Sequence, residues 1–343
     1  MKIPLFEKLN KKIGIDLGSF RTRIWVDGSG VVIDEPTCIA FDKKNKSVLA
    51  VGEEAAQMDG RVGEHIEVCY PVVGGKIYDM AALTALLKIW LTQSVGTIAL
   101  YNPIIMASIP VSATQADREI TTQVLYALGA GEAYTIAQPL AAGIGAGVPI
   151  ADASGSFLLH LGAGVVEGVI ISLGSVIVSQ SSEYAGEYLS NSICLYTQKN
   201  LDLKISKKTA TVLKNEVISV EFGSAREKLV AGQDTVDESP KELVVKSKDL
   251  FGHTISYMEK IEDLVVNLLS KMPPELAVDV IDKGLLLTGG TAKLHGIEIF
   301  FVEKLGIPVS VVDNSELAAI EGIGQVLENL DLFRKSLGYQ DEI

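Results

Sequence analysis

The sequence contains few cysteines and has no excess of basic residues. Its three cysteines, Cys38, Cys69 and Cys194, are far apart and form no CxxC pair, which argues against a disulfide framework and a zinc site. The four histidines are equally scattered, so no metal cluster is visible. Lys and Arg number 30 against 43 Asp and Glu, which gives a net charge of -13. Because affinity for nucleic acid comes from neutralising phosphates, no nucleic-acid partner is expected.

Uninterrupted apolar runs are also scarce. Residues 157–179 carry only His160 and Glu167 as ionisable groups and are long enough to span a bilayer. Glycines divide this stretch into short runs rich in Val and Ile, which favours two buried strands joined by a turn over a transmembrane helix. With 343 residues and 48% apolar content, the chain is long enough for two domain-sized cores.

The N-terminal residues 1–12 form a basic segment on an acidic protein, with four lysines against one glutamate. Ile3, Phe6 and Leu9 would share one face of a short helix. This composition suits an interfacial anchor on an anionic membrane. The alternative is a frayed leader that precedes the first strand.

An internal repeat sets the expected architecture. Residues 13–26 and 157–171 each contain an apolar strand, a turn of small residues around Gly18 or Gly162, and a second apolar strand, which predicts two β-hairpins. Strand patterns follow at residues 31–41 and 176–180, and helical patterns at residues 80–92 and 186–200. Backbone N–H groups in a glycine turn can approach phosphate oxygens closely. A third glycine turn, within residues 284–291, ends a buried strand.

The order of these motifs resembles that of the actin-like ATPases. The matching stretches are Asp16-Leu17-Gly18-Ser19, a Gln-Pro-Leu-Ala-Ala segment that begins at Gln138, the second hairpin, and a Leu-Thr-Gly-Gly turn that ends at Gly290. Within that superfamily the chain resembles the MreB family of bacterial shape-determining proteins from about residue 13 to residue 329. The most similar stretches are residues 50–55, 138–149, 273–277 and 326–329.

The resemblance implies an α/β fold of the actin-like ATPase type, with two duplicated RNase-H-like domains (four subdomains) around a nucleotide cleft. Domain I is expected over residues 13–150 and domain II over residues 151–343. The helix after about residue 315 is expected to return to domain I.

The resemblance also implies a function. Such a protein binds ATP and Mg²⁺, assembles with itself or with a sister MreB into filaments, and determines cell shape by guiding cell-wall elongation proteins. Its expected place is cytoplasmic, peripheral on the inner face of the cytoplasmic membrane. Leu100 and Tyr101 fall in a loop that inserts into the bilayer in this family. The alternative is a loop packed on its own subdomain.

Carried onto this chain, the resemblance gives catalytic positions to Asp16, Gln138 and His160, the last in degenerate form, with Asp16 holding magnesium through water. The expected nucleotide-binding residues are Gly18, Ser19, Phe20, Arg21, Gly162, Ala163, Gly164, Val165, Gly186, Glu187, Lys214, Gly289, Gly290 and Thr291.

The sequence departs from the family at the second hairpin. His160 stands where the family has an aspartate that helps to organise magnesium, and a neutral imidazole is a poor ligand for an ion that prefers oxygen. We therefore expect a degenerate site in which magnesium is doubtful and ATP hydrolysis is slow or absent. The first hairpin gains Arg21 and Arg23, which either offer guanidinium groups to phosphate or lie on a solvent-facing strand.

Two other functions remain open from the sequence. One is a nonpolymerising membrane adaptor of the pilus-assembly or FtsA type, although the short tail of mixed charge at residues 333–343 does not resemble the amphipathic helix of FtsA. The other is a phosphotransferase similar to sugar or acetate kinases, which would need a carboxylate base near the transferred phosphoryl group.

Overall fold

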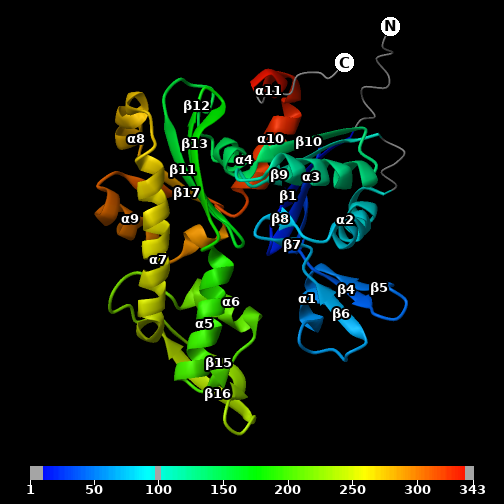
Figure 1. Cartoon of the computed structure of the whole chain (residues 1–343), viewed down its shortest axis with the longest axis vertical. Coiled ribbons are helices and arrows are strands. Elements are labelled where there is room, and N and C mark those ends of the chain that lie inside the picture. The colour runs from blue at the N-terminus through cyan, green and yellow to red at the C-terminus, as the bar shows by residue number, and fades with distance from the viewer. Residues whose placement is uncertain (1–10, 97–101, 337–343) are drawn as a thin grey trace. The chain divides into compact units, whose positions relative to one another are not determined.

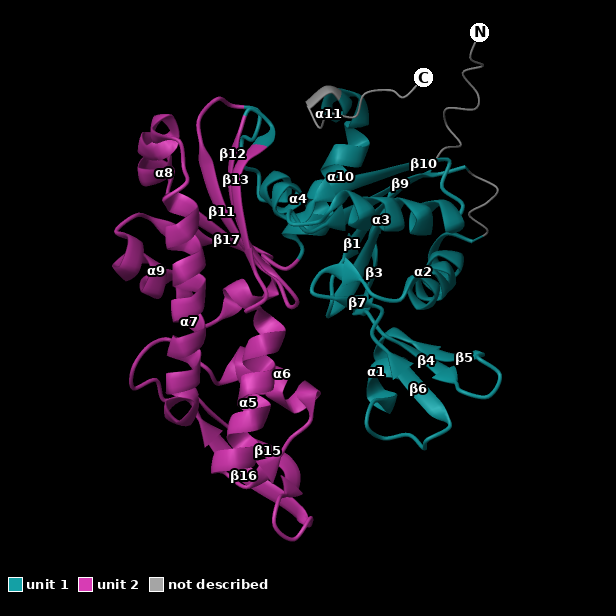
Figure 2. Ribbon diagram, viewed as in Figure 1, with its two compact units in different colours: residues 1–151, 173–175, 317–343 teal, residues 152–172, 176–316 magenta. Residues whose placement is uncertain are grey.

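The computed structural model describes residues 11–96 and 102–336 (Figure 1). The chain divides into two compact units (Figure 2). Unit 1 takes in residues up to Ala151, the short segment Leu173–Ser175 and the C-terminal residues from Leu317 onward. Unit 2 comprises Asp152–Ser172 and Val176–Glu316.

The main sheet of unit 1 has five strands in the order β10-β9-β1-β2-β3. The strands β1 and β2 form an antiparallel hairpin, and β9 and β10 run parallel to β1. The elements of this unit are β1 (Lys12–Leu17), β2 (Arg21–Val26), β3 (Gly30–Pro36), β4 (Ile39–Asp42), β5 (Val48–Val51), α1 (Gly52–Met58), β6 (Ile66–Cys69), β7 (Val72–Val73), β8 (Lys76–Ile77), α2 (Met80–Val95), β9 (Ile104–Ile109), α3 (Gln115–Ala127), β10 (Glu132–Ala137), α4 (Gln138–Gly145), α10 (Ala318–Glu328) and α11 (Leu330–Ser336).

Because side chains alternate along β1, its two faces pack against different parts of unit 1. Ile13, Ile15 and Leu17 point into a core that includes the leucines of α2. Gly14 lies on the opposite face, where a Cβ would be 2.7 Å from the side chain of Ile323 on α10. Asp16 shares this second face by the same period of two, so the only charged residue of β1 beyond Lys12 lies away from the α2 core.

The main sheet of unit 2 has the order β13-β12-β11-β17-β18, in which β11 pairs antiparallel with β12 and parallel with β17. The elements of this unit are β11 (Ser156–Leu161), β12 (Val166–Ser172), β13 (Ser175–Ser182, which begins in unit 1), α5 (Gly186–Asn200), β14 (Leu203–Lys204), α6 (Lys207–Glu216), β15 (Glu227–Asp234), β16 (Pro240–Lys246), α7 (Ser247–Leu269), η3 (Pro274–Leu276), α8 (Ala277–Lys283), β17 (Leu285–Thr288), η4 (Gly290–Lys293), α9 (Ile297–Leu305) and β18 (Val309–Val311). The long helix α7 packs on this sheet, since a Cβ at Gly168 of β12 would be 3.0 Å from Leu268.

The two main sheets repeat one topology. Read from the outer strand of each hairpin, β3-β2-β1-β9-β10 corresponds to β13-β12-β11-β17-β18. In each sheet a hairpin is followed, across the sheet, by two strands parallel to its first strand. The predicted duplication of an α/β unit that opens on a hairpin is therefore confirmed.

The predicted local elements agree with the structure apart from one. Residues 157–179 form strands as expected, and the helical patterns correspond to α2 and α5. No helix within residues 11–96 and 102–336 is long and apolar enough to cross a membrane. The strand expected over residues 31–41 is two strands, β3 and β4, because Cys38 N–H donates to the carbonyl of Pro36 in a tight turn.

Candidate functional site

The first hairpin, β1–β2, ends in a turn that has no room for a side chain at Gly18. A Cβ there would be 2.3 Å from the carbonyl oxygen of Arg21. The carbonyl of Gly18 accepts a hydrogen bond from the Thr37 hydroxyl at 2.7 Å, and the Ser19 hydroxyl accepts one from the N–H of Gly75 at 2.8 Å. Phe20 is half exposed. The turn is thus held from both sides while its tip remains accessible.

Asp16 lies buried beside this turn and accepts several hydrogen bonds. Its Oδ1 accepts from the Ser108 hydroxyl at 2.8 Å and from the amide Nε2 of Gln138 at 2.7 Å. Its Oδ2 lies 3.5 Å from Nη1 of Arg23. The structure therefore brings together Asp16 and Gln138, the two residues with predicted catalytic roles in this unit, and ties the amide of Gln138 to the carboxylate.

A row of polar side chains crosses the first sheet at this level. Asp16 is paired in register with Arg23 on β2, and Arg23 with Asp34 on β3. Arg21 also binds Asp34, through Nε at 2.6 Å from Oδ1 and through a second contact to the Asp34 carbonyl. The Arg23 side chain is only 12% exposed, so it does not lie on a solvent-facing strand.

The second hairpin, β11–β12, carries an equivalent row with different chemistry. His160 takes the place of Asp16, and its Nδ1 is 3.1 Å from the hydroxyl of Thr288 on the neighbouring parallel strand β17. Its cross-strand partner is the buried Glu167, whose Oε1 accepts from the Ser181 hydroxyl at 3.4 Å. In unit 1 the acid is on the first strand and the base on the second, and in unit 2 this order is reversed.

The turn of the second hairpin caps the N-terminus of α5. The N–H groups of Gly186 and Glu187 donate to the carbonyls of Gly162 at 3.0 Å and Ala163 at 2.8 Å. Since Ala185 offers no side-chain cap, these carbonyls satisfy two of the free N–H groups that begin every helix. Both N–H groups are thereby engaged by protein, and the assignment of Gly186 and Glu187 to nucleotide binding stays a prediction from the resemblance.

Lys214 and Thr291 lie against the same helix start. A Cβ at Gly186 would be 2.4 Å from the Thr291 hydroxyl and 3.0 Å from Nζ of Lys214, so only glycine fits there. Nζ of Lys214 is 3.4 Å from the carbonyl of Gly186. Burial lowers the pKa of Lys214 from 10.5 to about 8, with the nearby Glu187 opposing that shift. A desolvated amine of this kind fits an anionic or strongly polar ligand.

The third glycine turn joins this group in unit 2. Gly289 has φ of +88°, and a Cβ on it would be 2.5 Å from the Leu161 carbonyl. Its N–H donates to the carbonyl of Ser315, whose hydroxyl donates back to the carbonyl of Gly289. A Cβ at Gly290 would meet nothing within 4 Å. The backbone beside Gly290 is therefore open to a ligand.

The first hairpin does not fit a magnesium ion held through Asp16. Magnesium requires about six oxygen ligands in near-octahedral geometry. Both carboxylate oxygens of Asp16 already face protein donors, and the neighbouring guanidinium of Arg23 repels a divalent cation. Within the described part of the chain, no group of three or more His, Cys, Asp and Glu side chains is arranged to hold a metal ion.

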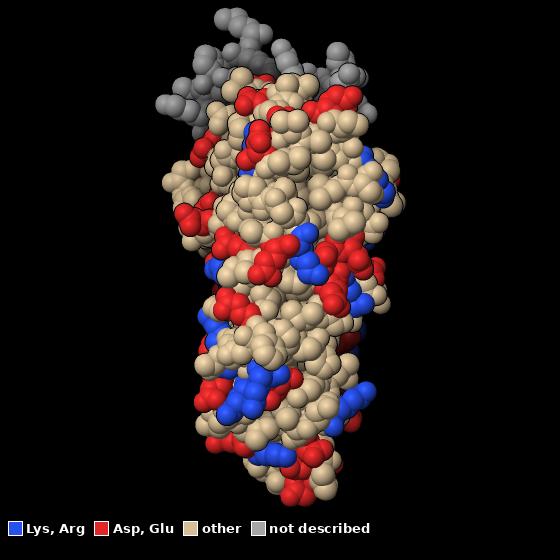
Figure 3. All heavy atoms as spheres, turned by 90° about the vertical axis from the view of Figure 1, so that its left-hand side faces the viewer, with Lys and Arg blue, Asp and Glu red and all other residues tan. Residues whose placement is uncertain are grey.

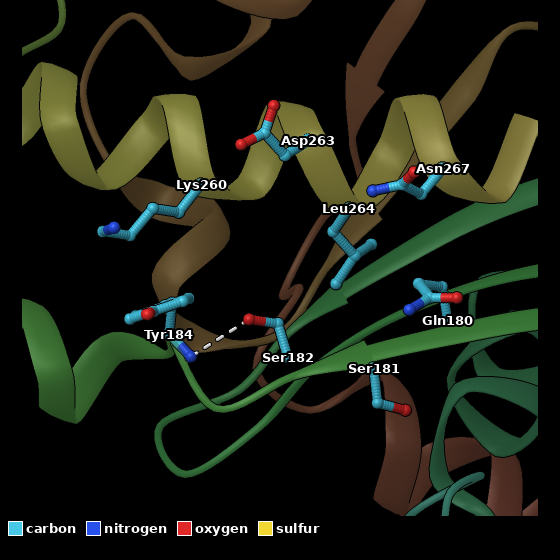
Figure 4. Close-up of a pocket in the computed structure, with 8 residues that line it drawn as sticks. All are labelled: Gln180, Ser181, Ser182, Tyr184, Lys260, Asp263, Leu264 and Asn267. Carbon is cyan, nitrogen blue, oxygen red and sulfur yellow. Dashed lines mark hydrogen bonds between the residues drawn. The ribbon is translucent and has the colours of Figure 1, made fainter.

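A separate depression lies between β13 and α7 of unit 2, with a volume of about 370 Å³ (Figure 4). Lys260 lies over the ring of Tyr184, 4.4 Å from its centroid. The lining residues are Gln180, Ser181, Ser182, Tyr184, Lys260, Asp263, Leu264 and Asn267. The depression contains none of the predicted nucleotide-binding residues.

On the face shown in Figure 3, basic and acidic side chains are interspersed rather than gathered in a basic patch.

The profile of the family described as MreB/Mbl protein matches residues 10–335. The chain belongs to the MreB/Mbl family. The cell shape-determining proteins Mbl of Bacillus cereus and MreB of Escherichia coli are each 32% identical to it over 326 residues. These alignments cover 95% of this chain and 98% of Mbl, and 93% of this chain and 94% of MreB.

Solved structures agree with this membership in the MreB/Mbl family. MreB5 of Spiroplasma citri bound to AMPPNP superposes with a TM-score of 0.90 at 29% identity, and the match covers 95% of this chain and 98% of that one. The MamK double helical filament, at 16% identity, superposes with a TM-score of 0.77 over 93% of this chain and 99% of that one, which shows the shared fold. The predicted actin-like fold is confirmed.

Several site residues of this MreB/Mbl-family chain could not be singled out from the sequence. Ser108 is the penultimate residue of β9 and Thr288 is the last residue of β17, and each binds the polar residue of the neighbouring hairpin strand. Their common signal is a hydroxyl directly after a run of apolar residues, a pattern too frequent to predict a site. The predicted membrane residues Ile3, Phe6, Leu9, Leu100 and Tyr101 lie outside the described residues.

Proposed function

We propose that this chain is a cell shape-determining cytoskeletal protein that binds an adenine nucleotide and assembles with itself on the cytoplasmic membrane. The observation that carries the proposal is the duplicated row, in which Asp16 or His160 binds a hydroxyl on the adjacent parallel strand beside a glycine turn. MreB5 of Spiroplasma citri was solved with AMPPNP and with ADP, at 29% and 30% identity to this chain, which supports a nucleotide as the ligand.

Within unit 2, the chemistry suits a nucleoside. Lys214 and Thr291 offer an amine and a hydroxyl beside Gly186, and Gly290 leaves the backbone open. Within unit 1, the turn at Gly18 and Ser19 offers a backbone approach to phosphate oxygens. These residues would bind and orient the nucleotide, which itself supplies the transferable phosphoryl group.

Hydrolysis of ATP is proposed to be slow or absent. Activation of the attacking water requires a group free to accept or position it. Asp16 accepts from Ser108 and Gln138 and faces Arg23, and the second hairpin offers an imidazole bonded to Thr288 where the family has a carboxylate. Neither arrangement provides the pair of carboxylates that the family uses.

Release of phosphate by the purified protein tests this part, with an active MreB assayed in parallel and a His160→Asp variant included. We expect wild-type turnover well below that of the active MreB and a higher rate for His160→Asp. Wild-type turnover equal to that of the active MreB would contradict the proposal.

Assembly is tested by sedimentation and electron microscopy with ATP, with ADP and without nucleotide. We expect polymer in at least one nucleotide state, and binding of that polymer to vesicles that contain anionic lipid. The combined variant Ile3→Ser, Phe6→Ser and Leu9→Ser should retain assembly and lose vesicle binding. A chain that binds vesicles but never polymerises would instead be the nonpolymerising adaptor.

A further inference from the structure

The carboxylate of Asp16 is already neutralised by a cation of its own hairpin. Arg23 is its cross-strand partner, and the two side chains are 12% and 4% exposed, with Nη1 of Arg23 3.5 Å from Oδ2 of Asp16. An ion pair removed from water is screened far less than one on the surface. The guanidinium thus supplies, inside the fold, positive charge beside the carboxylate that the resemblance assigns to magnesium.

Arg23 is held in place from its other side as well. Its Nε lies 3.3 Å from Oδ1 of Asp34, but that carboxylate makes its short contact with Arg21, at 2.6 Å. The geometry leaves Nε of Arg23 buried and without a hydrogen-bond partner among the described residues. A guanidinium carries five N–H donors, so a fixed cation with unused donating capacity lies beside the first glycine turn.

The charges of this cluster cancel. Asp16 and Asp34 contribute two negative charges, and Arg21 and Arg23 contribute two positive ones. A divalent cation would add charge to a site that is already balanced. A phosphate group would instead bring negative charge to the guanidinium groups, and Arg binds phosphate through a planar, permanently charged fork.

We propose that the first hairpin binds the phosphates of the nucleotide without a divalent metal, with Arg23 in the place of the magnesium charge. This inference rests on the proposed binding of an adenine nucleotide and specifies its chemistry. The Arg23 guanidinium is positioned before the ligand arrives, because Asp16 and Asp34 hold it within the sheet register.

The test is calorimetric titration of the whole protein, freed of nucleotide, with ADP and with ATP, each in excess magnesium chloride and in excess EDTA. We expect the dissociation constants in the two conditions to agree within about threefold, a difference below 1 kcal/mol. Binding that requires magnesium would overturn the inference and leave the proposed function intact. If neither ADP nor ATP binds in either condition, both the inference and the proposed function are overturned.

Variants then assign the effect to Arg23. In EDTA we expect Arg23→Leu to weaken nucleotide binding by about tenfold or more, because a charge-assisted contact is lost, and Arg23→Lys to weaken it less. Arg61→Leu, which removes an exposed arginine of the same unit, should bind as the wild type does. Thermal unfolding of each variant checks that it is folded. A folded Arg23→Leu protein that binds as tightly as the wild type in EDTA would overturn the role of Arg23.

Discussion

Gly322 of α10 lies directly against the backbone of Ala141 on α4. A Cβ at position 322 would be 1.8 Å from the carbonyl oxygen of Ala141, and one at Gly145 would be 1.9 Å from the carbonyl of Ala318. The two helices therefore approach each other as closely as their backbones allow. This packing fixes α4, whose first residue, Gln138, binds Asp16.

Substitution at this contact should be strongly destabilising. We expect Gly322→Ala to lower the free energy of unfolding by about 3 kcal/mol, since overpacking against rigid backbone cannot be relieved by a rotamer change. The matched control is Gly252→Ala on α7, which is exposed with nothing within 4 Å of the added Cβ. It should raise stability by about 0.5–1 kcal/mol. Urea unfolding measures the change in stability of both variants. Equal changes would contradict the close helix contact at Gly322.

Asp117 should stabilise α3 in a manner that depends on pH. It binds Lys76 and completes a capping box with Thr114, and these contacts lower its pKa from 3.8 to about 2. A lowered pKa in the folded state gives stability that is present above pH 3.8 and lost as the pH falls toward 2.

We expect Asp117→Asn to cost about 1 kcal/mol at neutral pH. The difference from the wild type should shrink below about pH 4, as denaturant unfolding at several pH values would measure. Glu119→Gln removes an exposed carboxylate from the same helix and serves as the control. A constant difference over the whole pH range would exclude the ionised carboxylate as the cause.

Nucleotide affinity should fall as the pH rises through about 8. Lys214 has that pKa in the free protein, so its positive charge is lost above this pH and an anionic ligand then gains less from it. Calorimetry with ADP would measure the change, which is at most about tenfold per pH unit for one group. Lys214→Arg stays charged and should bind with little dependence on pH. Lys199→Arg, an exposed change on α5, should keep the wild-type profile.

Cys38 should be inert in the folded protein. Its side chain is fully buried, and burial raises the pKa of its thiol from 9.0 to about 12, so little thiolate is present at neutral pH. Cys194 is only partly buried. After brief treatment of native protein with iodoacetamide, peptide mapping should find Cys194 modified before Cys38. Rapid modification of Cys38 without denaturant would show that the packing around the turn between β3 and β4 opens readily.

Much of the fold could be predicted because it follows from local pattern. Residues close together in the sequence set the apolar strands on either side of the turns at Gly18 and Gly162. They also set the helical periods at residues 80–92 and 186–200. The replacement of the family's aspartate by His160 could also be seen in the sequence, because it changes one residue within a recognisable motif. The division of residues 31–41 into two strands was missed, although Pro36 is a local signal that a strand ends and β3 does end there.

The two hairpins, their glycine turns and the exchange of an acid for an imidazole follow from the sequence, since these are properties of contiguous residues. Which distant side chains contact Asp16 and His160 depends on the tertiary fold. Gln138 and Ser108 reach Asp16 from 122 and 92 positions away, and Thr288 reaches His160 from 128. The pairing of strands sets such contacts, and a shift of one residue in register would turn every one of these side chains to the opposite face of its sheet.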